Sequence, residues 1–339
     1  MAQASSDDKA PSLSVCVIAY NSGPTLRTCL ERLHAQSFRD FETIVIDNAS
    51  PDPGDVAIAA EFPWVRLVRN AENLGFAGAG NQGARLARGR WYVLLNPDAF
   101  AEPDWLAELV AAAARHPEVR VFTSRQLTAE DPGVLDGLGD VMSIWGIPYR
   151  GGYMSRDTGQ AFEGEVFSPC GAAMMIDRAL FLELGGFYER YFAYGEDVDL
   201  GYRLQLMGQP TVLVPKAVVH HLGSASSGGP KSEFAVFHGT RNRFWGVYKN
   251  TPWPLLPLVI PLHLGAVVFI SSRRPNWPHI PIVWRAFLAS LKGLPAILRD
   301  RRAVQADRRI AIADIARAMT WNPKDLTYRR PVIRPLRRP

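Results

Sequence analysis

The segment Tyr194-Gly-Glu-Asp-Val-Asp-Leu200 brings three carboxylates within four positions, those of Glu196, Asp197 and Asp199. A single carboxylate would suffice to cap a helix here, because the helix macrodipole stabilises negative charge at its N-terminus. Three carboxylates repel one another, and burial would turn that repulsion into raised pKa values. A carboxylate in such a cluster can act as a general base that removes a proton from a hydroxyl group.

Asn96-Pro97-Asp98 follows the apolar run Trp91–Leu95 and therefore stands where a buried strand would end. A carboxylate at that place can hold a divalent cation, which prefers oxygen ligands and bridges a diphosphate. The alternative is that Asp98 caps a helix over residues 105–114. Because Pro103-Asp104 already has the residue types of that helix's start, Asp98 is left free for another task.

His220-His221 follows the last strand that we predict and precedes a stretch rich in Gly and Ser. A histidine beside an acidic site can bind a metal ion. A lone histidine is more often a hydrogen-bonded structural residue, so the neighbours decide between the two interpretations.

The segment Asn73–Gly83 carries glycines at positions 75, 78, 80 and 83 around the start of a predicted helix. Glycine lets the backbone approach a phosphate or a sugar closely, and a helix N-terminus attracts anions. The segment lacks the lysine of a phosphate loop. Its GxGxxG letters follow the third strand, where a dinucleotide fingerprint would follow the first. Tight packing of the helix explains these glycines equally well.

The elements that must position these residues alternate between short apolar runs and helix-like stretches. The runs are too short for helices and too continuous for half-solvated strands, so they predict buried strands in a right-handed parallel βαβ sheet. We interpret residues 123–167, which are rich in glycine, as a loop-rich connection over the face that carries the site. The predicted strands are Ser14–Ala19, Thr43–Asp47, Val65–Val68, Trp91–Leu95, Cys170–Ile176 and Thr211–Pro215, and the predicted helices are Thr25–Gln36, Arg178–Leu184 and Asp197–Met207.

Polar residues stand at the ends of three predicted strands, where a parallel sheet binds its ligand. These ends are Ala19-Tyr20-Asn21, Asp47-Asn48-Ala49-Ser50 and Asn96-Pro97-Asp98. A lone Asp after a strand usually forms a turn or caps a helix. Three polar ends at one edge of a sheet indicate a site.

The segments that carry these residues occur in the order expected of a family-2 glycosyltransferase with the GT-A fold: SVCVIAYNS, VIDNASPD, NLGFAGAGNQG, LLNPD, CGAAMMI, GGFYERYFAYGEDVDLGYRL and VVHHLGSAS. The chain especially resembles the bacterial rhamnosyltransferase-like branch, over about two-thirds of its length, from Ser14 to Ser226. The resemblance implies an α/β fold of the GT-A type, with a mixed, mainly parallel sheet flanked by helices and a C-terminal helical region.

The resemblance also implies the chemistry, an inverting direct displacement on a nucleotide-sugar donor with a divalent cation (Mg²⁺ or Mn²⁺) on the diphosphate. By position, Asp98 would hold the metal, and His220 would add a ligand as it does in some members. Asp197 would be the base that deprotonates the acceptor hydroxyl, and Glu196 would orient the acceptor or the base. The branch suggests rhamnose from dTDP-rhamnose as the donor. The sequence offers no Ser/His/Asp or Cys/His arrangement for a covalent intermediate.

The donor pocket is expected along the strand ends and the glycine-rich segment. Asp47 matches a position that reads the pyrimidine base, and Ala19, Tyr20 and Asn21 would line the nucleotide pocket. Asn96 stands where many members have the first Asp of a DxD motif, and Ala19 stands where Thr is frequent. The intact Glu-Asp pair argues against an inactive protein. The remaining predicted donor contacts are Asn73, Gly75, Phe76, Asn81, Asn96 and Asp98.

The composition is that of a folded protein, since 47% of the 339 residues are hydrophobic and 21% are charged. It excludes a disordered or collagen-like chain. The 3 cysteines lack CxxC spacing and predict neither a disulfide framework nor a structural zinc site. The N-terminal MAQASSDDKAP has no apolar core of a secretory signal, so we expect a reducing compartment. We divide the chain into a catalytic domain (12–226), a helical membrane-associating region (227–310) and a basic tail (311–339).

The net charge of +5 hides an asymmetry: residues 273–339 carry 16 Lys and Arg against 4 Asp, and the rest of the chain is mildly acidic. Such a segment is attracted to an anionic surface. Trp253–Ile270 contains no Asp, Glu, Lys or Arg, but its prolines at 254, 257 and 261 disfavour an unbroken helix in its first half. We therefore favour a segment that dips into or lies on a membrane over a true span or a buried core element.

Residues 284–298 place Trp and Leu at helical spacing opposite Arg285, Lys292 and Arg299, a pattern typical of a basic helix at a lipid interface. The sequence has no nucleic-acid motif, so we expect an anionic membrane surface and no nucleic acid as partner. A membrane-resting transferase would use a polyprenyl-diphosphate-linked glycan acceptor in surface-polysaccharide synthesis. We expect a peripheral or monotopic protein at the cytoplasmic face of the inner (plasma) membrane.

Two other functions stay open at this point. A nucleotidyltransferase that makes a sugar nucleotide shares the α/β layout, but it would prefer a Gly-rich loop with Lys or Arg after the first strand, and YNSGPTLR is a poor version of one. The other is a non-catalytic membrane scaffold with a retained fold.

Overall fold

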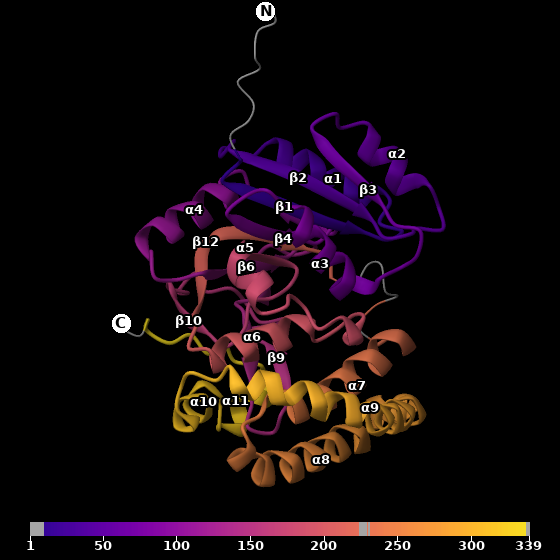
Figure 1. Cartoon of the computed structure of the whole chain (residues 1–339), viewed down its shortest axis with the longest axis vertical. Coiled ribbons are helices and arrows are strands. Elements are labelled where there is room, and N and C mark those ends of the chain that lie inside the picture. Colours follow the sequence, from indigo (N-terminus) through magenta and orange to yellow (C-terminus); the bar gives the residue numbers. More distant parts are fainter. Residues whose placement is uncertain (1–9, 224–228, 230, 337–339) are drawn as a thin grey trace, which may run out of the picture.

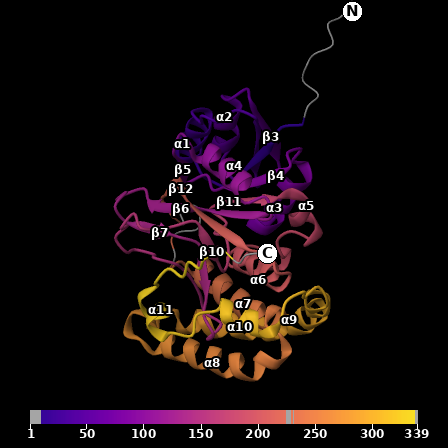
Figure 2. The ribbon, with the colours of Figure 1, turned by 90° about the vertical axis from the view of Figure 1, so that its left-hand side faces the viewer.

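The computed structural model describes residues 10–223, 229 and 231–336. Figure 1 shows two layers: the strands and their covering helices lie in the upper part, and the helices from α7 (Glu233–Asn250) to α11 (Pro323–Tyr328) lie in the lower part. Figure 2 shows the same two layers from the side. The chain thus places its C-terminal helices against one end of the sheet region.

The N-terminal half of the sheet is parallel, with the strands in the order β3, β2, β1, β4. Alternate residues of these strands enter two cores, because successive side chains of a strand point to opposite faces. Val15 and Val17 lie in one core, and Cys16 and Ile18 lie in the other. The elements are β1 (Leu13–Ala19), α1 (Pro24–His34), β2 (Phe41–Asp47), α2 (Gly54–Ala60), β3 (Val65–Arg69), α3 (Gly75–Leu86) and β4 (Trp91–Leu95).

The second half makes the sheet mixed. Beyond β4 come an antiparallel β11, then β6, then β12, which is parallel to β6, and finally β10. The predicted α/β class with a mixed sheet is confirmed. The elements are β5 (Ala99–Ala101), α4 (Trp105–Arg115), β6 (Val121–Thr128), β10 (Gly164–Val166), β11 (Ala173–Asp177), α5 (Arg178–Glu183), α6 (Glu196–Leu206) and β12 (Thr211–His221).

Residues 123–167 contain more structure than the predicted loop-rich connection. Besides most of β6, this segment forms β7 (Leu135–Gly137), β8 (Asp140–Met142) and β9 (Pro148–Arg150), and β8 and β9 pair as a separate antiparallel hairpin. Strands of three residues are too short to show an alternating pattern of apolar and polar residues, so β7, β8 and β9 could not be predicted from the sequence. The segment was also predicted to lie over the face that carries the site. This agrees with the structure, since the β8–β9 hairpin faces the cavity described below.

The C-terminal helices α7, α8 (Leu256–Ser272) and α9 (Ile280–Ala306) pack as long neighbours. Pro254 lies in a 3₁₀ turn and Pro257 in the first turn of α8, where a missing amide donor costs little. The helix nevertheless continues through Pro261. The predicted interruption is therefore confined to the start of the segment.

The basic C-terminal segment packs back onto the sheet region. It contains α10 (Ile312–Ala318) and α11, and it forms β-bridges from Thr320 to Ser143 and from Arg334 to Glu165. Ile315 is fully buried. The predicted boundary at residue 226 lies outside the described residues, as do residues 1–9 and 337–339. The division into three regions stays a prediction.

Candidate active site

A cavity of about 890 Å³ lies between the carboxyl ends of the strands, the β8–β9 hairpin, the start of α6 and one side of α7. Its lining includes Asp98 at the sheet edge and Asp197 at the start of α6. These two carboxylates come from positions almost a hundred residues apart and share one cavity. The predicted transfer chemistry, with a metal ligand at Asp98 and a base at Asp197, requires that these two residues share a cavity.

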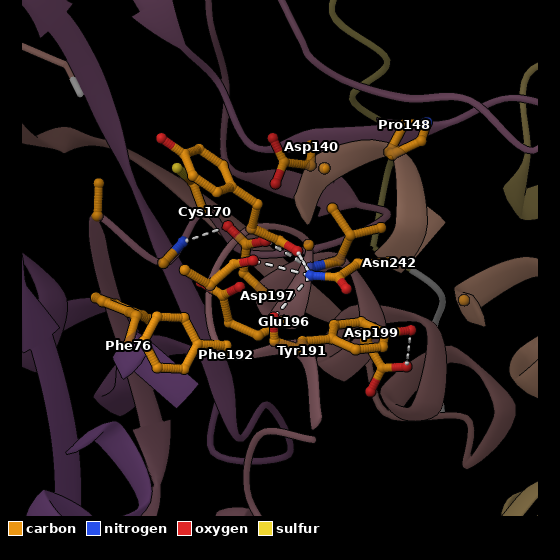
Figure 3. A pocket seen from close by; sticks show the side chains of 18 of the residues that line it. Phe76, Asp140, Pro148, Cys170, Tyr191, Phe192, Glu196, Asp197, Asp199 and Asn242 are labelled. Carbon is orange, nitrogen blue, oxygen red and sulfur yellow. Dashed lines mark hydrogen bonds between the residues drawn. The ribbon is translucent and has the colours of Figure 1, made fainter. Parts of the chain in front are cut away.

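The loop before α6 has an unusual backbone. Phe192 and Tyr194 have φ of 66° and 70°, and Gly195 has φ of 84°. Residues other than glycine rarely adopt these positive φ values. The amide of Asn242 on α7 holds this loop: its Nδ2 donates to the carbonyl oxygens of residues 191, 193 and 194 at 3.0, 2.8 and 2.7 Å. Figure 3 shows these hydrogen bonds beside Glu196 and Asp197. Helix α7 therefore fixes the geometry of the acidic cluster.

Asp197 presents a partly exposed carboxylate to the cavity. Its Oδ2 accepts a hydrogen bond of 3.0 Å from the backbone amide of Gly171, and its Oδ1 accepts one of 2.8 Å from the amide of Val198. These two donors orient the carboxylate and leave lone pairs on both oxygens for another partner. A carboxylate held in this way can accept a proton from a bound hydroxyl.

Glu196 is buried, and its Oε2 has no hydrogen-bond partner among the described residues. Burial raises the pKa of Glu196 well above its ordinary value, and the negative charge of Asp197 raises it further. In its protonated form this carboxyl can donate a hydrogen bond.

Asp199 has a structural role. Its carboxylate lies 2.8 Å from the Nζ of Lys249 and 2.9 Å from the Nε of Arg203, and it accepts a 2.7 Å hydrogen bond from Asn250. Burial alone would raise the pKa of Asp199, but the charges of Lys249 and Arg203 outweigh it and lower the pKa to about 2. The ionised Asp199 thus ties α6 to α7.

The opposite end of the site is built around Asp98. His221 Nε2 lies 3.3 Å from the carboxylate of Asp98, and His221 Nδ1 lies 2.8 Å from that of Asp136. Arg150 pairs with Asp136. Burial lowers the pKa of His221, but the hydrogen bonds with the two carboxylates raise it above its ordinary value. Asn96 adds a buried Oδ1 for which the described residues provide no hydrogen-bond partner.

The residues around Asp98 fit a divalent cation. A carboxylate oxygen, an imidazole nitrogen and an orphaned amide oxygen are ligands that Mg²⁺ or Mn²⁺ accepts. Candidate ligand atoms also meet at Asp140, Cys170 and Asp197, within 4.8 Å of one another. Burial raises the pKa of Cys170 to about 12, and its thiol donates to Gln126, so this second group is a poor site for a hard cation.

His220 does not reach this site. Its Nε2 lies 3.1 Å from the carboxylate of Glu102, and its side chain does not line the cavity. The predicted strand Thr211–Pro215 continues to His221, so the two histidines point to opposite faces of β12. The structure does not place the predicted ligand His220 beside Asp98, and its neighbour His221 occupies that place.

Several of the predicted donor contacts line the cavity, namely Tyr20, Asn73, Gly75, Phe76, Asn96 and Asp98. Ala19, Asn21, Asp47 and Asn81 do not. Ala19 is buried in the core behind the sheet edge. Asp47 accepts a hydrogen bond from the amide of Ser50 and so closes its own turn. The backbone amide of Asn21 donates to the hydroxyl of Ser50.

Asn81 and most of the glycines serve packing. Asn81 lies on α3, where its side chain bonds both the amide and the carbonyl of Phe187. A Cβ on Gly80 would lie 3.0 Å from the Phe187 ring, and one on Gly83 would lie 2.5 Å from the Sγ of Cys16. Gly75 is different, because it lines the cavity with φ of 70° and lies against the Phe192 carbonyl.

Sequence reasoning missed several residues of the site. Asp136, Asp140 and Arg150 lie in the segment interpreted as loop. Their only sequence signal is charge among glycines, in LDGLGD for the two carboxylates and in PYRGG for Arg150. Burial raises the pKa of Asp140 well above its ordinary value, and the charge of Asp197 adds to this. Asn48, Asn242 and Arg243 also line the cavity. Nothing in the local sequence marks the two residues on α7.

The comparisons with known proteins agree with this geometry. The model of glycosyl transferase family 2 matches residues 14–185. An N-acetylglucosaminyl-diphospho-decaprenol L-rhamnosyltransferase of Mycobacterium tuberculosis is 27% identical over 325 residues, which cover 88% of this chain and 95% of that protein. The O-antigen biosynthesis protein RfbC of Myxococcus xanthus is 30% identical over 227 residues, which cover 64% of this chain and 18% of that protein.

Solved structures show the same fold. A mannosyltransferase of Pyrobaculum calidifontis in complex with GDP-Man and Mn²⁺ superposes with a TM-score of 0.53 at 19% identity and covers 93% of this chain and 88% of its own. Residues 1–349 of S. aureus TarS superpose with a TM-score of 0.54 at 15% identity, covering 91% and 90%. At such identities the likeness concerns the fold alone. The family match establishes that the chain is a glycosyltransferase of glycosyl transferase family 2, and the Mycobacterium tuberculosis relative supports its place in the rhamnosyltransferase-like branch.

Proposed function

We propose that this glycosyltransferase moves rhamnose from dTDP-rhamnose to a polyprenyl-diphosphate-linked glycan, by a metal-dependent, inverting displacement. One observation carries the proposal: Asp98, with the features of a cation ligand, and Asp197, with those of a base, line a single cavity. A single displacement needs a stabilised leaving group on one side of the sugar carbon and a proton acceptor on the other.

The acceptor side belongs to Asp197. Its carboxylate, oriented by the amides of Gly171 and Val198, removes the proton of the acceptor hydroxyl as that oxygen attacks. Glu196, in the protonated form that burial favours, donates a hydrogen bond to a sugar hydroxyl and so orients the acceptor. No covalent intermediate is required.

The donor side belongs to Asp98, with His221 and Asn96 as further ligands of a divalent cation. These residues would hold the cation, and the chemistry it would supply there is neutralisation of the negative charge on the departing nucleoside diphosphate. Asp136 accepts a hydrogen bond from His221 and fixes the orientation of its ring. The nucleotide contacts Tyr20, Asn73, Gly75 and Phe76, which line the adjoining part of the cavity.

The donor and the acceptor follow the named relative. The printed name of the Mycobacterium tuberculosis protein gives rhamnose as the sugar and a diphospho-decaprenol-linked N-acetylglucosamine as the acceptor. The long mutual coverage supports a related acceptor for this chain. A lipid-linked acceptor also requires that the protein meet a membrane.

The proposed membrane face is the outer side of α8 and α9. Two helical segments, Trp253–Ser272 and Arg274–Ala306, are long and apolar enough to cross a membrane, with mean hydropathy of 2.0 and 1.3. Their large apolar side chains lie exposed, among them Trp253 at 73%, Val268 at 69% and Trp284 at 60%. The proline turns and the flanking arginines favour helices that rest in the cytoplasmic interface over helices that span.

A panel of nucleotide sugars tests the donor assignment. The purified protein is mixed with dTDP-, UDP- and GDP-sugars in Mg²⁺ or Mn²⁺, and thermal shift and donor hydrolysis are recorded. We expect dTDP-rhamnose to stabilise the fold most and to be hydrolysed only with metal. Equal stabilisation by all the nucleotide sugars, or hydrolysis in EDTA, would contradict the proposal.

A further inference from the structure

Arg243 lines the cavity from α7 without an acidic partner. Across residues 10–223, 229 and 231–336, no carboxylate lies within 4.0 Å of its guanidinium, although most other arginines near the site are paired. Its buried Nε has no hydrogen-bond partner in this part of the chain, and its one side-chain hydrogen bond is a 3.4 Å contact with Thr240. The residue as a whole is half-buried. A partly desolvated cation without a counter-ion is stabilised when an anionic ligand completes it.

Arginine keeps its positive charge in proteins, and the surroundings of Arg243 supply no negative charge among the described residues. Burial lowers its pKa to about 10, so it stays protonated at neutral pH. His263 on α8 is its titratable neighbour, and burial, with the charge of Arg243, lowers the pKa of His263 to about 3. His263 is therefore neutral. The unsatisfied positive charge calls for an anionic ligand.

The position of Arg243 points to the acceptor side. Its chain neighbour Asn242 holds the loop that leads into Glu196 and Asp197, and Arg243 lines the same cavity as these two carboxylates. Gly146 and Val247 line the cavity too, and His263 bonds the carbonyl of Trp145 behind them. The donor diphosphate has a separate place at Asp98, on the sheet edge.

The cavity also adjoins the apolar helices. Val247 packs in one cluster with Val259 on the inner side of α8, whose other side exposes Val268 and Phe269. An amphiphile whose chain rests on α8 and α9 can thus bring its head group to α7. A guanidinium binds phosphate oxygens through paired, charge-assisted hydrogen bonds.

We propose that Arg243 binds the diphosphate of an isoprenoid-diphosphate-linked acceptor and so places the acceptor sugar at Asp197. This inference rests on the proposed function, because it assumes a lipid-linked acceptor. It assigns Arg243 a binding role that is separate from the cation at the donor diphosphate.

The test measures metal-free binding of farnesyl diphosphate, a short isoprenoid diphosphate, to the full chain in EDTA. EDTA removes any binding that a cation at Asp98 would mediate. We expect the Kd of Arg243→Gln to rise about tenfold or more, and that of Arg243→Lys to rise less, since a lysine keeps the charge but loses the paired geometry. Arg299→Gln on the exposed side of α9 removes the same charge away from the cavity and should leave the Kd unchanged. Farnesol should bind all four proteins equally.

A second arm separates the acceptor diphosphate from the donor diphosphate. With Mn²⁺ present, dTDP binding should survive in Arg243→Gln, which also shows that this variant is folded, and should be lost in Asp98→Asn. In EDTA, farnesyl diphosphate should bind Asp98→Asn as it binds the unaltered protein.

Three results would overturn the inference: an unchanged farnesyl diphosphate Kd in Arg243→Gln, an equal weakening in Arg299→Gln, or an equal weakening of dTDP binding in Arg243→Gln. Failure of the proposed function looks different. In that case the unaltered protein would hydrolyse no nucleotide sugar with any metal, whatever the farnesyl diphosphate measurements give.

Discussion

The carboxylate of Asp199 lies 2.8 Å from the ammonium group of Lys249, and both side chains are buried. This contact joins α6, which begins with the acidic pair of the site, to α7, which holds the loop in front of it. The position of the acidic cluster Glu196–Asp197 therefore depends on a buried ion pair between two helices.

Lys249→Met tests this dependence. It leaves the buried Asp199 with Arg203 as its remaining charged partner, and removal of one partner of a buried pair usually costs about 3–5 kcal/mol. We expect the free energy of unfolding to fall by about that amount, as measured by urea denaturation. Lys324→Met, at an exposed position on α11, serves as the control and should change the free energy little. Equal stability of the two variants would show that Arg203 alone satisfies Asp199.

Asp197→Asn should lower turnover by about 10²–10⁴-fold, because an amide cannot accept the acceptor proton. The backbone amides of Gly171 and Val198 bind different oxygens of Asp197, so the one amide oxygen of Asn keeps only one of these hydrogen bonds. The donor site at Asp98 lies on another element and should survive. Sugar transfer and nucleotide affinity, measured side by side, check this. Retained turnover would identify another residue as the base. A scaffold without catalytic function would keep its role in this variant.

Glu196→Gln should change the pH dependence of stability. In the folded protein the pKa of Glu196 is raised, so between its unfolded pKa of 4.5 and its higher folded pKa the folded state binds more protons than the unfolded state. Its contribution to stability is therefore full below pH 4.5 and declines as the pH rises. Glutamine does not titrate, so the variant should gain stability relative to the unaltered protein as the pH rises from 4 to 8. Denaturation at several pH values measures this difference, and a constant difference would refute the raised pKa.

The two histidines at the end of β12 provide a matched pair. We expect His221→Gln to raise the Mn²⁺ concentration for half-maximal donor hydrolysis about tenfold or more, since the ring lies beside Asp98. His220→Gln should leave it unchanged, because His220 contacts Glu102 outside the cavity. A metal titration of both variants decides between them. A larger effect of His220→Gln than of His221→Gln would instead support His220 as the metal ligand, as predicted from the sequence.

The exposed tryptophans of the lower helices test the membrane face. Trp277 and Trp284 are 54% and 60% exposed, and their double replacement by Ser should weaken binding to anionic vesicles about tenfold or more. Met154, which is 63% exposed beside the sheet region, supplies the control Met154→Ser. Vesicle flotation at low and high salt measures the binding. A protein that stays wholly soluble after cell lysis without detergent would defeat the proposal.

The local sequence determined six of the strands (β1 to β4, β11 and β12), the helix that follows the acidic cluster, and the presence of Asp98 and Asp197 at element ends. These features are local, because hydrophobic period and turn residues act over a few neighbours. The strand ends of a parallel sheet meet at one edge, which placed Asp98 at the site. Asp197 begins a helix, so its expected place in the same cavity rested on the family resemblance.

Only the tertiary structure decided which side chains face that cavity. The exchange of His220 for His221 depended on where β12 ends, since a shift of one residue turns a side chain to the other face of a strand. The different roles of Glu196, Asp197 and Asp199 came from partners on α7 and β8, far away in the sequence. Arg243 stood out for the same reason. Its lack of a counter-ion is a property of the packed cavity. The sequence alone does not show which charged side chains will lack a partner, because the partners come from distant parts of the chain.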